Sequence, residues 1–430
     1  MEKLSIIIAL IIFSVLVLIH EFGHFIVAKK NGIVVNEFSI GMGPRLVSFD
    51  KGGTKYSIKF LPFGGSCAML GEDEAVEVEG SFNSKSVWAR MAVVFAGPFF
   101  NFILAWILAI IVIAYAGTDL SYVTKVEKGS PAYEAGLREG DQIVKYNGAH
   151  ALLAREISLE NYVNPLDGSD MAIEYKRDGK KHTAKFEPDS VERYLVGMSY
   201  SSSDSEATIT VTRGSAMAEA GAISGDIVTA INGTSISTGR EMSEYLQENP
   251  WNGSEVQIVV SRNGKSQELT LKPRMTMVYG DGFEYNFIRK KQSVTGVIRY
   301  SFTEVRYQIT TVLKSLKMLV TGQVSTKEMS GPVGIVDAIG DTYQETKSEG
   351  ILTTIMTMIN MAIMLSANLG VMNLLPIPAL DGGRLVFFII EAIRRKPLDR
   401  EKEGFVHFIG FACLMLLMVF LIVNDVGKLI

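Results

Sequence analysis

Long apolar runs divide the chain into four hydrophobic segments and one large polar stretch. Mainly apolar residues occupy 4–19, 91–116, 351–375 and 405–423. Because a bilayer core about 30 Å thick needs roughly 20 helical residues, these runs predict four transmembrane helices. The first run resembles a signal peptide, but no small-residue cleavage site follows it, so we expect an uncleaved helix.

The polar, glycine-rich stretch between the second and third runs contains a repeat. Residues 129–148 and 214–233 align without gaps at an offset of 85, with nine identities in twenty positions. The same offset aligns residues 167–188 with 252–273. A constant offset over two separate blocks indicates tandem domains of one fold.

Each repeat has the same order of predicted elements. A strand leads through a Gly-Ser turn to a short alanine-rich helix, which ends at Gly136 or Gly221. The next strand ends at an Asn-Gly turn, and a hairpin follows. This pattern resembles PDZ domains, at about 119–189 and 190–275. PDZ domains usually bind an extended peptide at a sheet edge. Two alternative roles for the repeats stay open: structural spacers without a ligand, or a size filter that blocks folded ectodomains.

Composition and charge support a membrane protein. The chain has 430 residues, of which 47% are apolar and 20% charged, and its mean hydropathy is positive. The net charge of −4 is too small to indicate nucleic-acid binding. Cys67 and Cys413 are far apart in sequence, so we expect no disulfide.

Basic residues beside the apolar runs predict their orientation. Lys29 and Lys30 follow the first run, Arg90 precedes the second, and residues 394–396 separate the third from the fourth. The positive-inside rule places these flanks in the cytoplasm. Both termini and residues 118–350 are therefore expected outside.

The first run contains the sequence HEFGH, an HExxH motif. His20 and His24 lie one turn apart on the same helix face, so both imidazoles could bind one Zn²⁺. Glu21 lies beside that face and could take a proton from water activated by the metal. An ionisable group in a span costs at least about 2.5–3.5 kcal/mol on insertion scales. Three such groups within five residues therefore indicate a catalytic site.

Catalytic zinc needs a third protein ligand and an open fourth position. His150 and His182 lie in the repeat region, and His407 begins the fourth run. Asp381 is a better candidate, because it follows two prolines in the segment NLLPIPALDGG (373–383). Prolines end a helix, and broken backbone at membrane depth must line a cavity or water. The alternative is that Asp381 only caps the helix that starts after it.

Together, these motifs resemble a known enzyme family. An HExxH in the first span paired with NLLPIPALDGG in a later span is similar to the site-2 protease family of intramembrane zinc metalloproteases. The bacterial RseP-type branch, with PDZ domains between spans two and three, is the closest in pattern. Residues 96–105 and 330–335 also match family blocks, and the resemblance covers essentially the whole chain.

The resemblance implies a role for each site residue. It assigns the zinc to His20, His24 and Asp381, and general acid/base catalysis to Glu21. It also implies that Asn373 helps to hold the substrate backbone.

Residues 33–70 alternate like strands around the sequence DKGG and predict a β-hairpin. These residues resemble the membrane-associated β-hairpin of the RseP-type family, whose edge can pair with an extended substrate. Gly41 and Gly43 match its Gly-x-Gly element, which implies substrate binding. The family's aromatic residue and lysine after Gly-Gly are replaced here by GGSCAML, so roles at those positions do not carry over. A purely structural sheet is the alternative.

Apolar residues at helical spacing between 302 and 320 predict an amphipathic helix on the outer membrane surface. An ordinary core-packing helix is the alternative.

The expected fold class is a polytopic α-helical membrane protein with four transmembrane helices, a membrane-associated β-hairpin and two extracytoplasmic α+β PDZ domains. The predicted boundaries are transmembrane helix 1 with HExxH at 1–30, the hairpin region at 31–87, helix 2 at 88–117, the PDZ domains at 118–189 and 190–275, a linker with an amphipathic surface helix at 276–350, helix 3 with its Pro-broken motif at 351–380, a cytoplasmic connection at 381–402, and helix 4 at 403–425.

The expected function is regulated intramembrane proteolysis at a bacterial inner membrane, with the zinc site toward the cytoplasm. The resemblance implies substrates such as anti-sigma factors or remnant signal peptides. Single-span membrane substrates, the lipid bilayer and a peptide ligand of the PDZ domains are the expected partners. A non-proteolytic adaptor would more often close a structural zinc with four protein ligands. A metal transporter would need polar ligands at several depths, and spans two and four offer little beyond Asn101 and His407.

Overall fold

The computed structural model describes residues 3–72, 78–262, 264–286, 288–324, 329–396 and 398–429. The chain forms two compact units, one built from residues 1–120 and 287–429 and the other from residues 121–286.

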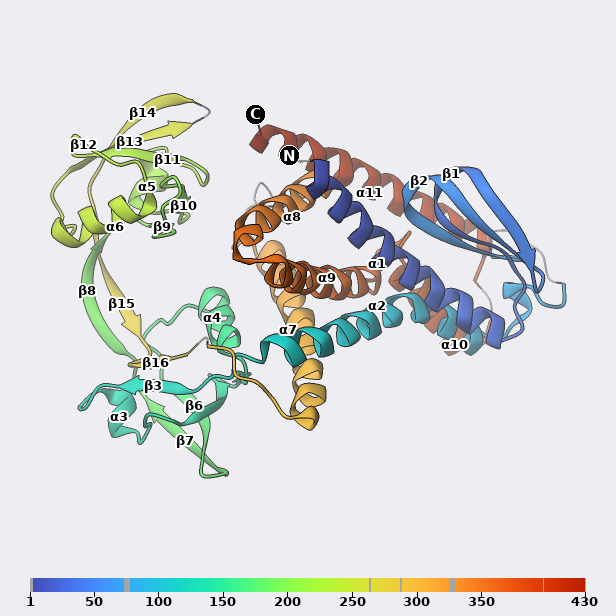
Figure 1. Ribbon diagram of the computed structural model, residues 1–430, viewed down its shortest axis with the longest axis horizontal. Coiled ribbons are helices and arrows are strands. Elements are labelled where there is room, and N and C mark those ends of the chain that lie inside the picture. The colour runs from blue at the N-terminus through green and yellow to red at the C-terminus, as the bar shows by residue number, and fades with distance from the viewer. Residues whose placement is uncertain are drawn as a thin grey trace. The chain divides into compact units, whose positions relative to one another are not determined.

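Within the described ranges, four helices of the first unit are long and apolar enough to cross a membrane. They are α1 (Lys3–Lys30), α2 (Val87–Ala116), α9 (Ile351–Asn373) and α11 (Arg400–Leu429) (Figure 1). Each coincides with one of the four apolar runs, which confirms that these runs form helices long and apolar enough to cross a membrane.

Small residues let these helices approach closely. A Cβ on Gly23 of α1 would lie 2.4 Å from the carbonyl oxygen of Ala96 on α2. Farther along α2, Ala105 and Ala109 pack with Ala367 of α9 in one buried cluster. Small side chains at helix interfaces allow the backbone-to-backbone packing on which association in a bilayer depends.

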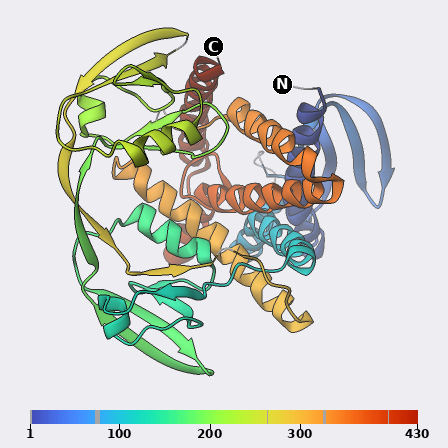
Figure 2. The same cartoon turned by 60° about the vertical axis from the view of Figure 1, so that its left-hand side comes forward.

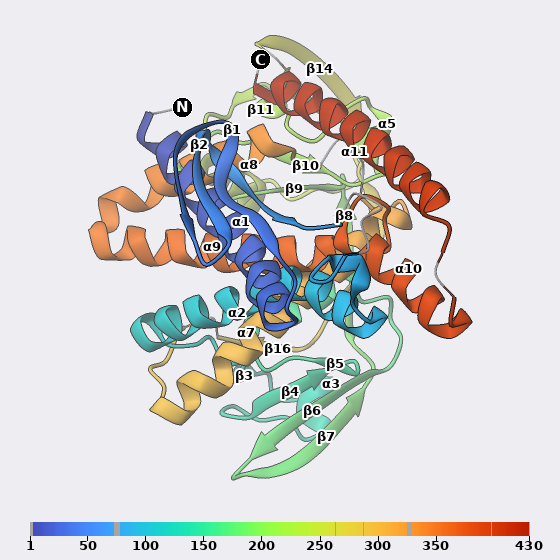
Figure 3. The ribbon, with the colours of Figure 1, turned by 90° about the vertical axis from the view of Figure 1, so that its right-hand side faces the viewer.

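The predicted hairpin is present. It consists of β1 (Val35–Lys51) and β2 (Thr54–Met69) around Gly52 and Gly53, whose φ angles of 58° and 73° suit glycine at a tight turn. The hairpin lies beside α1 (Figure 3), where the rings of Phe25 and Phe38 are 5.1 Å apart.

Both strands fold back on themselves. Residues 37–40 pair with 65–68 on one side and with 55–58 on the other, and residues 45–51 pair with 54–59. Residues 65–69 therefore form an edge of this sheet.

The segment predicted as a linker packs into the first unit. It contains α7 (Val294–Val320) and α8 (Pro332–Thr346). Val305 and Ile309 of α7 pack against α2 and α9 (Figure 2), and α8 packs against α1 and α9. The helix predicted within 276–350 is therefore present as α7, and part of its apolar face is buried on α2 and α9. The predicted connection after residue 380 likewise contains a helix, α10 (Asp381–Arg394).

The second unit contains the two repeats. In strand order, the sheet of the first repeat is β5 (Ala149–His150), β4 (Gln142–Tyr146), β6 (Met171–Arg177) and β7 (Lys180–Phe186), accompanied by α3 (Pro131–Glu134) and α4 (Ala154–Val163). The corresponding sheet of the second repeat is β12 (Thr234–Ser235), β11 (Ile227–Ile231), β13 (Val256–Arg262) and β14 (Lys265–Leu271), accompanied by α5 (Ala216–Glu219) and α6 (Gly239–Glu248). The same arrangement in both supports the tandem repeat inferred from the offset.

The repeats exchange their C-terminal segments. After the first repeat, β8 (Asp189–Leu195) pairs with β15 (Arg274–Gly280), and β9 (Met198–Tyr200) pairs with β10 (Ile209–Val211) of the second repeat. After the second repeat, β16 (Phe283–Tyr285) returns to pair with β3 (Val123–Val126) of the first.

The offset of 85 extends into these segments. It relates Tyr200 to Tyr285, whose hydroxyls lie 3.4 Å from Ser243 and 3.3 Å from Ser158. Phe283 belongs to the core of the first repeat. Residues 283–285, which lie beyond the boundary predicted at 275, thus pair and pack with the first repeat.

Candidate metal centre

The helix α1 presents both histidines of the HExxH motif to one buried place. His20 and His24 are each only 8% exposed, and their Nε2 atoms lie 3.2 Å apart. The spacing of one helical turn produces this arrangement, as the sequence predicted.

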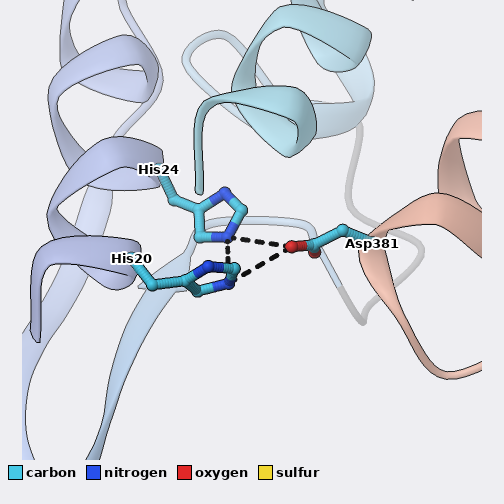
Figure 4. A group of neighbouring side chains, drawn as sticks. All are labelled: His20, His24 and Asp381. Atoms are coloured by element: carbon cyan, nitrogen blue, oxygen red, sulfur yellow. Dashed lines mark hydrogen bonds and ion pairs between the residues drawn. The ribbon is translucent and has the colours of Figure 1, made fainter. Parts of the chain in front are cut away.

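The third group comes from the break after α9. Asp381 is the first residue of α10, while Leu380 occupies the N-cap position. The Oδ2 atom of Asp381 lies 3.2 Å from His20 Nε2 and 3.5 Å from His24 Nε2 (Figure 4). Its carboxylate therefore faces α1 and does not cap its own helix.

Glycines and an ion pair hold this break in place. A Cβ on Gly382 would lie 2.2 Å from the Leu375 carbonyl oxygen, and one on Gly383 would lie 2.4 Å from that of Ile377. The close backbone approach expected from the sequence is therefore present. Farther along α10, Glu391 accepts a hydrogen bond of 2.5 Å from Arg90 of α2.

The three groups fit a zinc ion. Tetrahedral zinc with ligand bonds of about 2.0–2.1 Å separates its ligand atoms by roughly 3.3 Å. The three separations here are 3.2, 3.2 and 3.5 Å. Among the described residues, the buried Oδ2 of Asp381 has no hydrogen-bond partner, as expected of an atom reserved for a metal. Three protein ligands also leave the open position that catalysis requires.

Two groups on α2 orient the histidine rings. His24 Nδ1 lies 2.9 Å from the carbonyl oxygen of Val93, which can only accept, so this nitrogen carries the proton and Nε2 offers its lone pair. The side-chain amide of Asn101 lies 3.1 Å from His20 Nδ1. If His20 likewise binds metal through Nε2, the amide oxygen of Asn101 must face Nδ1–H, because amide orientation is assigned from the hydrogen-bond network.

A glycine on α2 makes room for both rings. A Cβ on Gly97 would lie 2.2 Å from His24 Nε2 and 2.9 Å from His20 Cε1. Gly97 and the orienting role of Asn101 were missed by sequence reasoning. The available signal for Asn101 was its position as the one strongly polar residue in the second apolar run.

Glu21 lies next to the edge of the β1–β2 sheet. A Cβ on Gly65 would be 3.3 Å from Cγ of Glu21 and 3.0 Å from the carbonyl oxygen of Ser39. Gly65, the first residue of the sheet edge 65–69, therefore lies beside the glutamate of the HExxH motif.

The remaining predicted site residues lie outside the three-residue cluster. Asn373 is the last residue of α9. Gly41 and Gly43 have φ angles of 83° and 87°, and a Cβ on Gly41 would lie 2.3 Å from the Leu61 carbonyl oxygen, so backbone geometry requires glycine there. Within the described ranges, no hydrogen bond or ion pair joins these three residues to the cluster.

The hairpin carries one strong ion pair outside the spans. Glu37 accepts hydrogen bonds from Arg45 (2.8 Å) and Ser57 (2.5 Å). The hydrogen bond from Arg45 is the main cause that lowers the pKa of Glu37 to about 2. Cys67 and Cys413 are both free thiols, as expected.

Sequence comparisons relate the chain to known proteins. A family model described as Peptidase family M50 matches residues 8–417. The zinc metalloprotease RasP of Geobacillus kaustophilus is 33% identical over 437 residues, covering 99% of this chain and 98% of that protein. The zinc metalloprotease RasP of Oceanobacillus iheyensis is 34% identical, covering 98% of each. The regulator of sigma-W protease RasP of Bacillus subtilis is 32% identical, covering 98% of this chain and 97% of that protein.

Proposed function

The chain belongs to peptidase family M50 and is a metalloprotease, and on this premise we propose that it is a zinc-dependent intramembrane endopeptidase. It hydrolyses peptide bonds in the transmembrane segments of single-span proteins. The observation that carries the proposal is the convergence of His20, His24 and Asp381 at separations suited to zinc, between helices apolar enough to cross a membrane.

The proposed roles follow from the chemistry of the side chains. His20, His24 and Asp381 hold zinc, which when bound supplies a Lewis acid for amide hydrolysis. The carboxylate of Glu21 takes the proton of the attacking water and returns it to the nitrogen of the leaving amine. The Val93 carbonyl and the Asn101 amide keep the two imidazoles in the tautomer that leaves Nε2 free.

The substrate must be unwound before it can react. A transmembrane helix satisfies its peptide groups internally, and in the membrane the exposed groups need other partners. We assign this role to the edge formed by residues 65–69, because it lies beside Glu21 and an extended chain can add to a sheet edge. Asn373, Gly41 and Gly43 are proposed to assist in holding the substrate backbone.

The two repeats are proposed to be extracytoplasmic PDZ domains of a protein in the bacterial inner membrane, with the zinc site toward the cytoplasm. The basic flanks of the spans support this orientation. The name of the Bacillus subtilis relative refers to regulation of a sigma factor, which supports anti-sigma factors as substrates; remnant signal peptides are a second class. The repeats either bind a peptide or exclude folded ectodomains.

The test is cleavage of a model single-span substrate by purified protein in detergent or proteoliposomes. Glu21→Gln should abolish cleavage while keeping bound zinc, because it removes only the proton acceptor. Glu349→Gln, an exposed glutamate, is the matched control and should cleave normally. Asp381→Ala should lose zinc, measured by elemental analysis. Undiminished cleavage by Glu21→Gln, or full zinc content and activity in Asp381→Ala, would refute the assigned roles.

A further inference from the structure

We propose that His407, on α11, is a positioning residue for Asp381. The inference rests on the proposed metal site and adds a residue from the fourth spanning helix to its support. His407 Nδ1 lies 2.8 Å from the backbone nitrogen of Ala379 and accepts its hydrogen bond. Because Ala379 shortly precedes Asp381 in the break after α9, this bond holds the backbone that aims the carboxylate.

Ala379 needs such support. Its φ angle is 79°, in the left-handed region that residues other than glycine rarely adopt. A residue in that conformation persists only where its surroundings enforce it. The following residue, Leu380, donates its N–H to the Ile377 carbonyl oxygen at 3.1 Å. The hydrogen bond to His407 thus holds the peptide group next to this unfavourable φ angle.

The helix α11 contacts the break at a second point. A Cβ on Gly410, one turn from His407, would lie 2.4 Å from the carbonyl oxygen of Pro378. The ring of His407 is also 5.3 Å from that of Phe387 on α10. The helix therefore contacts the chain both just before and just after Asp381.

His407 is a polar residue in an apolar part of α11, and two polar groups lie near its ring: the backbone nitrogen of Ala379 at 2.8 Å and the Glu403 carboxylate at 4.0 Å. Neighbouring side chains such as Phe408 and Phe411 are 67% and 55% exposed and apolar, as suits lipid contact. An apolar residue at 407 could not accept the hydrogen bond from Ala379. Donation from Ala379 to Nδ1 requires the tautomer with hydrogen on Nε2, which lies 4.0 Å from the Glu403 carboxylate.

Two variants separate the hydrogen bond from packing. His407→Phe keeps an aromatic ring but removes the acceptor. His407→Asn loses the ring but can offer its amide oxygen near the position of Nδ1. Phe408→Ala, at an exposed neighbouring position, is the control for changes on this helix. Zinc affinity of the full chain in detergent is measured by chelator competition, and the ligand set is monitored by the visible spectrum of the cobalt-substituted protein.

Zinc affinity should fall about tenfold in His407→Phe, the size typical of lost outer-shell support, with a shifted cobalt spectrum. His407→Asn and Phe408→Ala should match the parent protein. Should the Phe variant fail to fold, His407→Leu removes the same acceptor and takes its place. Parental affinity without the acceptor, or equal losses in the Asn and Phe variants, overturns the proposal. A parent protein that binds no zinc would instead refute the proposed function.

Discussion

Gly97→Ala should damage the metal centre by adding a single methyl group. Gly97 lies on α2 directly against the two histidines of α1. The new Cβ would stand 2.2 Å from His24 Nε2 and 2.5 Å from His24 Cε1. Ordinary van der Waals contact begins near 3.4 Å. Either His24 or the backbone of α2 must therefore move by about 1.2 Å, which is the difference between 3.4 Å and the 2.2 Å separation from His24 Nε2.

The ring is the part that should yield. The α1–α2 crossing is already tight, because a Cβ on Gly23 would lie 2.4 Å from the Ala96 carbonyl oxygen. Rotation of His24 breaks its hydrogen bond to Val93 and withdraws Nε2 from the other two ligands. Overpacking typically costs about 1–3 kcal/mol. If this cost falls on the zinc-bound protein and not on the zinc-free protein, zinc affinity falls roughly 5- to 150-fold.

The assay compares zinc affinity and thermal unfolding of the same full-length samples. Gly404→Ala is the matched control, because Gly404 is also helical and a Cβ there meets nothing within 4 Å. That control should bind zinc normally and gain up to about 1 kcal/mol from helix propensity. Parental zinc affinity in Gly97→Ala would refute the reasoning. Equal losses in both variants would show that the collision is not the cause.

Three further predictions follow from individual contacts. Hydrogen bonds to Glu37 lower its pKa to about 2, so the ionised carboxylate stabilises the folded hairpin. This stabilisation should be complete above pH 4.5 and should be lost as the pH falls toward 2. Pepsin cleavage of the hairpin should therefore rise over that window in the parent protein, but not in Glu37→Gln. Asp226 is 1% exposed and accepts two hydrogen bonds of 2.7 Å from Arg262. Because Arg262 is partly exposed to solvent, Asp226→Ala should destabilise the second repeat by about 1–3 kcal/mol, seen as faster hydrogen exchange in β11 and β13; unchanged protection would contradict this. Asn101→Leu should weaken zinc binding about tenfold in equilibrium dialysis, and parental affinity would remove Asn101 from the support of the site.

Local patterns in the sequence were sufficient to predict the spanning helices, several turns and the placement of the two histidines. Mainly apolar runs of membrane length predicted four helices, because the length of a span is a property of the local chain. Asn147 and Asn232, with φ angles of 47° and 48°, lie in the turns that the Asn-Gly pairs predicted. The HExxH spacing placed two histidines on one helix face for the same reason.

The proposed third zinc ligand, Asp381, could not be identified from local pattern alone. The position of Asp381 after a proline-broken span made it a candidate, and resemblance to a known family supported its assignment as a zinc ligand. Its approach to His20 and His24 depends on helices that are separated in sequence by more than three hundred residues. The periodicity of apolar residues predicts local helices, but it does not predict which helices far apart in the sequence come together.

Only the tertiary structure decided the surroundings of these elements. The return of residues 283–285 to the first repeat, the space that Gly97 leaves for two imidazoles, and the hydrogen bond from Ala379 to His407 all join distant segments. Each depends on which distant segments pack together, and a single residue such as Gly97 or His407 carries no local pattern that predicts its partner. The sequence by itself determined which helices and turns form and which side chains can bind a metal. The packing of those helices decided which side chains meet, because contact between distant segments is a property of the folded chain as a whole.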